Sequence, residues 1–159
     1  DGRSLGERSM AGRMDLVWLV AYAPGEIRAI GKTGGKTILE TAIRTAGPAA
    51  SVKAICDNTK LRADGRDVAH IEASIVDAAG VVVPNSAHRV RFSVEGPARL
   101  IGVDNGDPAS REPLKGRSVP AFHGLCLAIA QAEKKAGAIA VAVEWDGLAP
   151  AQIRLMAEE

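Results

Sequence analysis

The sequence predicts an all-β protein built around a β-sandwich, and three observations support this. Apolar and polar residues alternate with a period of two over several short segments, which is typical of strands with one buried face. Residues that favour turns separate these segments. The 159 residues are enough for one domain of about 100 residues plus part of another. Many short strands punctuated by turns are typical of two packed antiparallel sheets.

The alternation is clearest in three segments. Val90, Phe92 and Val94 share one face of the first, and Ile71–Ile75 and Ile153–Leu155 repeat the pattern. Each turn signal between such segments supplies a positive φ or a preset φ where the chain reverses. These signals are Pro24-Gly25, Gly34-Gly35, Asp64-Gly65, Asp77-Ala-Ala-Gly80, Gly96-Pro97, Asn105-Gly106 and Asp146-Gly147.

The N-terminal third predicts a meander of three strands, over Leu16–Tyr22, Ile27–Gly31 and Thr37–Arg44. A domain boundary is expected near Thr45–Ala50, because Pro48 removes a ladder donor. Such a partial sheet exposes an edge and an apolar face. We therefore expect it to be covered by the terminal domain or by a second copy of the chain, as a homo-oligomer.

Two regions carry a family resemblance. Arg89–Pro108 followed by Pro120–Leu127, and the earlier stretches Asp1–Arg8, Val17–Gly31 and Glu40–Gly47, resemble the C-terminal region of family 2 glycoside hydrolases of the β-galactosidase type. The resemblance implies an immunoglobulin-like (invasin-like) β-sandwich over residues 48–159. It also implies that residues 1–47 are the C-terminal part of a preceding β-sandwich domain, here a partial meander segment.

The segment from Leu125 to Gly137 is rich in strong helix formers. The alternation of Ile139, Val141 and Val143 and the family resemblance instead favour two strands joined as a hairpin by a turn over Glu133–Gly137. One position departs from the family pattern, because Leu114 stands where the family usually carries an aromatic residue.

The resemblance implies a non-catalytic C-terminal structural or accessory fragment of a β-galactosidase-like enzyme that hydrolyses terminal β-glycosides. The family's catalytic glutamates lie on an upstream barrel, and the chain has no Asn-Glu dipeptide to match the acid/base residue. The expected partner is the rest of that enzyme, including its barrel. Two alternatives remain open, namely a bacterial adhesion or invasin-type immunoglobulin-like repeat and a carbohydrate-binding module.

The composition sets further expectations. The formal net charge of +1 gives no broad attraction to nucleic acid, and no apolar run approaches the roughly 18 residues of a membrane span. The chain begins at Asp1 without a leader, which suggests a piece of a larger protein. A periplasmic or extracellular location would suit the parent enzyme. No cofactor is expected.

One polar loop is the candidate inter-domain or ligand-binding site. Its members, to which we add Trp145 beside a turn, are Asp104, Asn105, Asp107, Arg111, Glu112, Lys115 and Arg117. An Asx-stabilised turn with solvated charges is the competing interpretation. A calcium site is disfavoured, because calcium takes about six to eight oxygen ligands. The aspartates of a second cluster are expected to flank turns, and these are Asp57, Asp64 and Asp67.

The remaining candidates favour structural roles. Gly31–Thr37 is one glycine short of a phosphate-binding loop, because Ile30 stands at the required position; a hairpin turn is expected there. Cys56 and Cys126 form no metal or redox motif, so two buried free thiols are expected. His70, His88 and His123 are expected to be isolated at the surface or in turns. Trp18 is expected in the core, and Trp145 in either the core or an interface.

Overall fold

The computed structural model describes residues 2–147 and 150–159, and the chain divides into two compact units, Asp1–Thr45 and Ala46–Glu159. The described residues contain strands and no helix, which confirms the all-β prediction. The strands are β1 (Glu26–Thr33), β2 (Lys36–Arg44), β3 (Ala49–Cys56), β4 (Lys60–Arg62), β5 (Val68–Asp77), β6 (Arg89–Glu95), β7 (Ala98–Asp104), β8 (Ser118–Pro120), β9 (Leu125–Ala132), β10 (Gly137–Trp145) and β11 (Ala151–Glu158).

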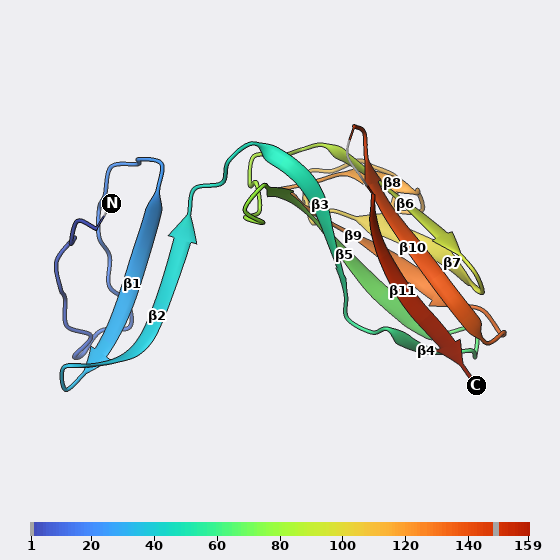
Figure 1. Cartoon of the computed structure of the whole chain (residues 1–159), viewed down its shortest axis with the longest axis horizontal. Helices are drawn as coiled ribbons and strands as arrows, with labels where there is room; N and C mark the ends of the chain where they lie inside the picture. The colour runs from blue at the N-terminus through green and yellow to red at the C-terminus, as the bar shows by residue number, and fades with distance from the viewer. Residues whose placement is uncertain (1, 148–149) are drawn as a thin grey trace. The chain divides into compact units, whose positions relative to one another are not determined.

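The second unit is a sandwich of two sheets (Figure 1), with strand orders β4-β11-β10-β6-β8 and β3-β5-β9-β7. All pairs are antiparallel except β4 with β11. The predicted alternation fills the space between the sheets. Ile71, Ile75, Val90 and Phe92 are fully buried, and Val94 packs against the same core from its edge.

The segment Leu125–Gly137, whose composition favours a helix, forms β9 and the turn that leads into β10. The two predicted strands are therefore confirmed, but the predicted hairpin is wrong. Strand β9 pairs with β5 and β7, whereas β10 pairs with β6 and β11 in the other sheet. The turn therefore crosses from one sheet to the other. The reason is burial, because Ala128 and Ala130 of β9 and Val141 of β10 all lie in the one core between the sheets.

The first unit contains a two-stranded hairpin. Thr33 pairs with Lys36, and Gly34 and Gly35 between them have φ of 56° and 77°, which a two-residue hairpin loop requires. This confirms the predicted hairpin turn. The strand predicted over Leu16–Tyr22 is wrong, because this segment pairs with no described strand and a strand needs a partner for its backbone groups. Asp1, the first residue of the family-like stretch, lies outside the described residues.

The hairpin of β1 and β2 has two unlike faces. Glu26, Arg28, Glu40 and Arg44 form linked ion pairs. The opposite face is apolar, because the register places Ile27 against Ile43 and Gly31 against Leu39. These isoleucine and leucine side chains are more than half exposed.

The burial of Trp18 and of the two cysteines agrees only in part with the predictions. The core role predicted for Trp18 is wrong, because its side chain is half-buried outside the core and Arg8 lies over its ring, 5.1 Å from the ring centroid. Both cysteines are free, as predicted, but only Cys126 is fully buried, whereas Cys56 is partly exposed. Burial raises the pKa of the Cys126 thiol to about 12, so the thiol stays protonated at neutral pH.

Candidate functional site

The predicted polar loop begins at the end of β7. The side-chain oxygens of its first two residues, Asp104 and Asn105, accept hydrogen bonds from backbone amides of the same turn. Asp104 Oδ1 accepts hydrogen bonds from the amides of Asn105 and Gly106, at 2.7 and 3.1 Å. Asn105 Oδ1 accepts from the amide of Asp107 at 3.0 Å, and Asn105 Nδ2 donates to the carbonyl of Pro120 at 3.0 Å. These oxygens stabilise an Asx-type turn.

The second half of the loop contains one ion pair. Arg89 of β6 donates two hydrogen bonds to the carboxylate of Glu112, at 2.8 and 3.0 Å. This bidentate geometry lowers the pKa of Glu112 below its ordinary value, chiefly through the hydrogen bond from Arg89. Arg111, Lys115 and Arg117 are exposed. The loop therefore presents cations to solvent while its carboxylates are engaged.

Trp145 is the last residue of β10. The register pairs it with Val90 of β6, so its side chain faces the inner layer and packs at the edge of the core. Its ring contacts His88 with centroids 4.0 Å apart. Trp145 therefore packs at the edge of the core beside Val90, the residue after Arg89, which binds Glu112 of the polar loop.

The histidines are less isolated than predicted. His70 lies within β5, and its Nδ1 is 2.7 Å from Asp57 Oδ2. His88 Nδ1 is 2.7 Å from Ser86 Oγ, and the ring of His88 contacts Trp145, so neither histidine is isolated, although His88 is exposed as predicted. His123 lies in a turn with φ of 51°, as predicted, and its ring contacts that of Phe122 with centroids 4.2 Å apart.

Asp57 and His70 form a pair that the sequence analysis missed. Asp57 Oδ1 also accepts from the backbone amide of His70 at 2.8 Å. Burial raises the pKa of Asp57, but the hydrogen bonds and charge of His70 outweigh it, so the net pKa lies below its ordinary value. The pairing depends on β3 and β5 being neighbours, and the 13-residue separation in sequence gave no signal of it.

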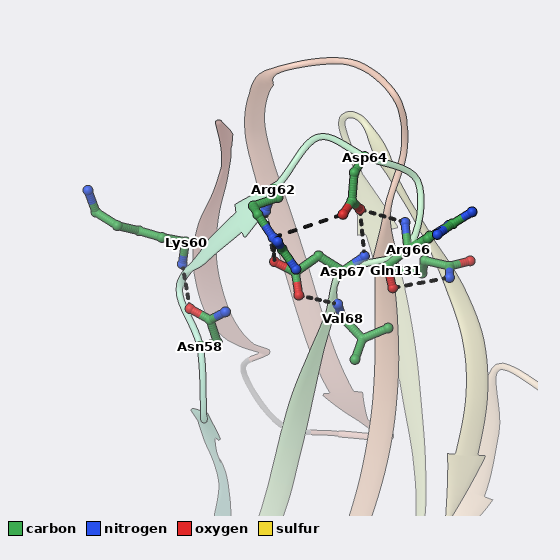
Figure 2. Close-up of polar contacts among 8 residues, drawn as sticks. All are labelled: Asn58, Lys60, Arg62, Asp64, Arg66, Asp67, Val68 and Gln131. Atoms are coloured by element: carbon green, nitrogen blue, oxygen red, sulfur yellow. Dashed lines mark hydrogen bonds and ion pairs between the residues drawn. The ribbon is translucent and has the colours of Figure 1, made fainter. Parts of the chain in front are cut away.

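Asp64 and Asp67, the other two aspartates of the second predicted cluster, stabilise the loop between β4 and β5, as Figure 2 shows. Asp64 Oδ1 accepts from the amides of Arg66 and Asp67, at 2.8 and 2.9 Å. Asp67 Oδ2 accepts from the amide of Arg62 at 2.8 Å, and Gln131 Nε2 lies 3.5 Å from the carbonyl of Arg66. The prediction that Asp64 and Asp67 flank turns is confirmed.

Asp77 is a second residue whose role was missed, because the Asp-Ala-Ala-Gly signal indicated only a turn. Its carboxylate accepts from the amides of Ala79 and Val81, both at 2.9 Å, and from the distant amide of Gly47 at 2.8 Å. The amides of Gly47 and Val81 lower the pKa of Asp77 below its ordinary value. One side chain therefore holds both a turn and the segment that leads into β3.

No constellation suited to bond cleavage emerges from the described parts of the chain. Among the hollows of the described residues, one is lined by Arg8, Ser9, Ala11 and Arg13 and another by Arg99, Leu100, Ile101, Lys115 and Gln131. Neither brings two carboxylates together, as glycoside hydrolysis requires. Within residues 2–147 and 150–159, no group of three or more His, Cys, Asp or Glu side chains could hold a metal ion. The same residues include no helix that is long and apolar enough to cross a membrane.

Comparison with known proteins gives the family of this β-sandwich. The model of glycoside hydrolase family 2 C-terminal domain 5 matches residues 52–154. The chain therefore belongs to the family 2 glycoside hydrolases, as their C-terminal domain. A domain of unknown function (DUF4982) matches residues 1–39.

Relatives and solved structures agree with this assignment. The chain is 33% identical to the β-galactosidase BoGH2A of Bacteroides ovatus, over 100% of this chain and 19% of that protein. It is 30% identical to a putative β-glucuronidase of Formosa agariphila over 60% of this chain and 9% of that protein. The crystal structure of a family 2 member from Bacteroides cellulosilyticus matches with a TM-score of 0.93 and 30% identity, over 100% of this chain and 21% of that one. The chain thus spans about a fifth of the length of the first and third of these proteins.

Proposed function

We propose that this chain is the non-catalytic C-terminal part of a retaining β-galactosidase-like enzyme, in which it stabilises the catalytic barrel or shapes access to it. The match to a β-galactosidase over the whole of this chain carries the proposal. The carboxylates described above are engaged in turns and ion pairs, which agrees with a structural role. The family assignment favours this function over the adhesion repeat.

Activity measurements on two forms of the protein test this proposal. We expect the longer polypeptide that contains this chain to hydrolyse nitrophenyl β-galactoside faster than nitrophenyl β-glucuronide. The 159-residue chain alone should hydrolyse neither. Turnover by the short chain would overturn the accessory role, and a preference for the glucuronide would overturn the sugar assignment only.

The first 47 residues are proposed to be the end of a preceding β-sandwich. An isolated two-stranded hairpin is marginally stable in water, and the apolar face that contains Ile27, Leu39 and Ile43 is largely exposed. Upstream strands of such a domain would cover this face. A second copy of the chain is the other candidate cover, and the molecular mass of the 159-residue chain in solution, measured by light scattering, distinguishes the two.

The polar loop is proposed to contact a neighbouring domain of the parent enzyme. Arg111, Lys115 and Arg117 are its exposed cations, and the ion pair between Arg89 and Glu112 holds the loop against β6. Exposed cations on an anchored loop can pair with carboxylates of a partner surface at little entropic cost. Replacing all three by Ser should weaken that contact and leave the sandwich itself unchanged.

A further inference from the structure

The chain passes from the first unit to the second through Thr45, Ala46 and Gly47, which we call the junction. The boundary between the units falls between Thr45 and Ala46. The junction follows β2 directly, and only Pro48 separates it from β3. Its two ends are each bonded to the unit on their own side.

Thr45 is fixed to the first unit by two hydrogen bonds with Gly25. The amide of Thr45 donates to the carbonyl of Gly25 at 2.8 Å, and the amide of Gly25 donates to Thr45 Oγ1 at 3.1 Å. These bonds extend the pairing of β1 with β2 beyond Glu26 and Arg44. The direction in which the chain leaves the hairpin is therefore set by the hairpin itself.

Gly47 is fixed to the second unit by Asp77. The amide of Gly47 donates to Asp77 Oδ2 at 2.8 Å. The same carboxylate is held in place by the amides of Ala79 and Val81, and Asp77 is only 7% exposed. The next residue, Pro48, has its φ fixed by its ring. The direction in which the chain enters β3 is therefore set by the sandwich.

Ala46 alone of the junction residues is held by no hydrogen bond among the described parts of the chain. Its Cβ also restricts φ and ψ more than a glycine would. A flexible linker consists of several residues that are free in this way. Here the bonded residues Thr45 and Gly47 leave only the dihedrals that adjoin Ala46 free to change.

We propose that the junction is a restrained connection, which confines any change in the relative orientation of the two units to the backbone dihedrals next to Ala46. Relative motion is otherwise the default expectation for domains in one chain, and hinges are the few residues at element ends that absorb it. The inference goes beyond the proposed function, because it concerns the 159-residue chain and holds for any substrate of the parent enzyme. Its test needs no measurement of activity, so the two proposals fail separately.

Distance distributions between two spin labels test the proposal in the 159-residue chain. In a Cys56→Ser background, Ala42→Cys places one label on β2 and Ser93→Cys places the other on β6, both at exposed positions. The remaining thiol, that of Cys126, is buried. Electron paramagnetic resonance then gives the width of the distribution.

Two insertions of the same length are compared. Insertion of Gly-Ser-Gly-Ser between Ala46 and Gly47 lengthens the junction and leaves the bonds at both of its ends in place. The control carries the same insertion between Gly34 and Gly35, at the turn from β1 to β2, where both glycines have open space around them. The control lengthens the chain without changing the junction.

We expect the original junction to give the narrower distribution. The inserted segment alone has an r.m.s. end-to-end distance of about 11 Å, so it should broaden the distribution by an amount of this order. The control insertion should leave the width unchanged. Equal widths for the original and the lengthened junction would overturn the proposal, because the original junction would then already move freely.

Asp77→Ala tests the bond to Gly47 separately. It removes that bond, so it should broaden the distribution by less than the insertion does. An unchanged width in a variant whose sandwich is folded would overturn the proposal. Cross-strand nuclear Overhauser effects between β1 and β2 check the hairpin in each variant. Their absence in the original chain would also overturn the proposal, because Thr45 is fixed only when the hairpin is formed.

Discussion

At the scale of single residues, the carboxylate of Asp77 joins two segments that are distant in sequence. It accepts hydrogen bonds from the amides of Gly47, Ala79 and Val81, and the residue is 7% exposed. In Asp77→Asn, an amide NH₂ replaces one acceptor oxygen and faces a backbone donor, which leaves that donor unsatisfied. We expect a lower melting temperature in thermal unfolding. The control is Asp107→Asn, whose side chain accepts from the amide of Ala109 alone and should change little.

The effect of Asp77 should depend on pH in a defined direction. The amides of Gly47 and Val81 lower its pKa in the folded state below the ordinary 3.8. Its stabilisation is therefore fully present above the ordinary carboxyl pKa and is lost as the pH falls through the lowered value. The difference in urea midpoint between wild type and Asp77→Asn should stay constant from neutral pH to about pH 5 and shrink in more acidic solution. A difference that grows on acidification would contradict this assignment.

Gly124 illustrates a second residue-scale effect, the close approach of backbones. It has a φ of 77°, and a Cβ there would lie 2.4 Å from the carbonyl oxygen of Val83. Gly80 has a nearly equal φ of 80° with open space around it. We expect Gly80→Ala to lose about 1–2 kcal/mol from backbone strain alone, and Gly124→Ala to lose about 1–3 kcal/mol more from the clash. Equal losses in urea unfolding would show that the approach to Val83 relaxes without cost.

The sequence predicted the polar side chains that bond to neighbouring backbone groups, but not those that bond to residues far away in the sequence. Asp64 and Asp67 act on neighbouring backbone groups, which their positions beside a turn predict. The contacts of Asp57 with His70 and of Asp77 with Gly47 depend on strand register, which no short motif encodes. The candidate polar loop shows both cases, because Asp104 stabilises its own turn while Glu112 pairs with a residue of β6.

At the scale of strands, β9 shows why composition and alternation disagreed. Its inner positions are small residues, Cys126, Ala128, Ala130 and Ala132, all buried. Alanine favours helices in isolation, but tertiary packing overrides that preference when one face of the segment is covered. Alternation therefore predicted the strand correctly. It could not predict which sheet each strand joins, since β9 and β10 bury the same kind of face whether they form a hairpin or cross between sheets.

The small inner residues of β9 predict that a larger side chain at these positions would overpack the core. Ala130 is 0% exposed in the core, so Ala130→Leu adds volume where none is free. We expect a loss of about 1–3 kcal/mol in the free energy of unfolding from overpacking, measured by urea denaturation. Ala138→Leu makes the same change at an exposed, outward position of β10 and should alter stability by no more than about 0.5 kcal/mol. A tolerated Ala130→Leu would indicate unfilled space between the sheets.

At the scale of the whole molecule, the two units differ in how much of their apolar surface they bury by themselves. The sandwich encloses a continuous core that includes residues of both sheets. The hairpin of β1 and β2 leaves its apolar face exposed. The sequence predicted both units from alternation and turns, but it did not predict that Leu16–Tyr22 would lack a partner, since alternation reports which face is apolar and not whether a neighbouring strand is present.

This difference predicts the behaviour of a truncated chain. The segment Ala46–Glu159 retains every strand of both sheets and the bond from Gly47 to Asp77. We expect it to unfold in one cooperative transition, at a melting temperature close to that of the main transition of the 159-residue chain, because a domain of about 110 residues buries enough surface to fold alone. Differential scanning calorimetry measures both. A truncated chain that lacks the transition and binds a hydrophobic dye would indicate that the sandwich depends on Asp1–Thr45 for its stability.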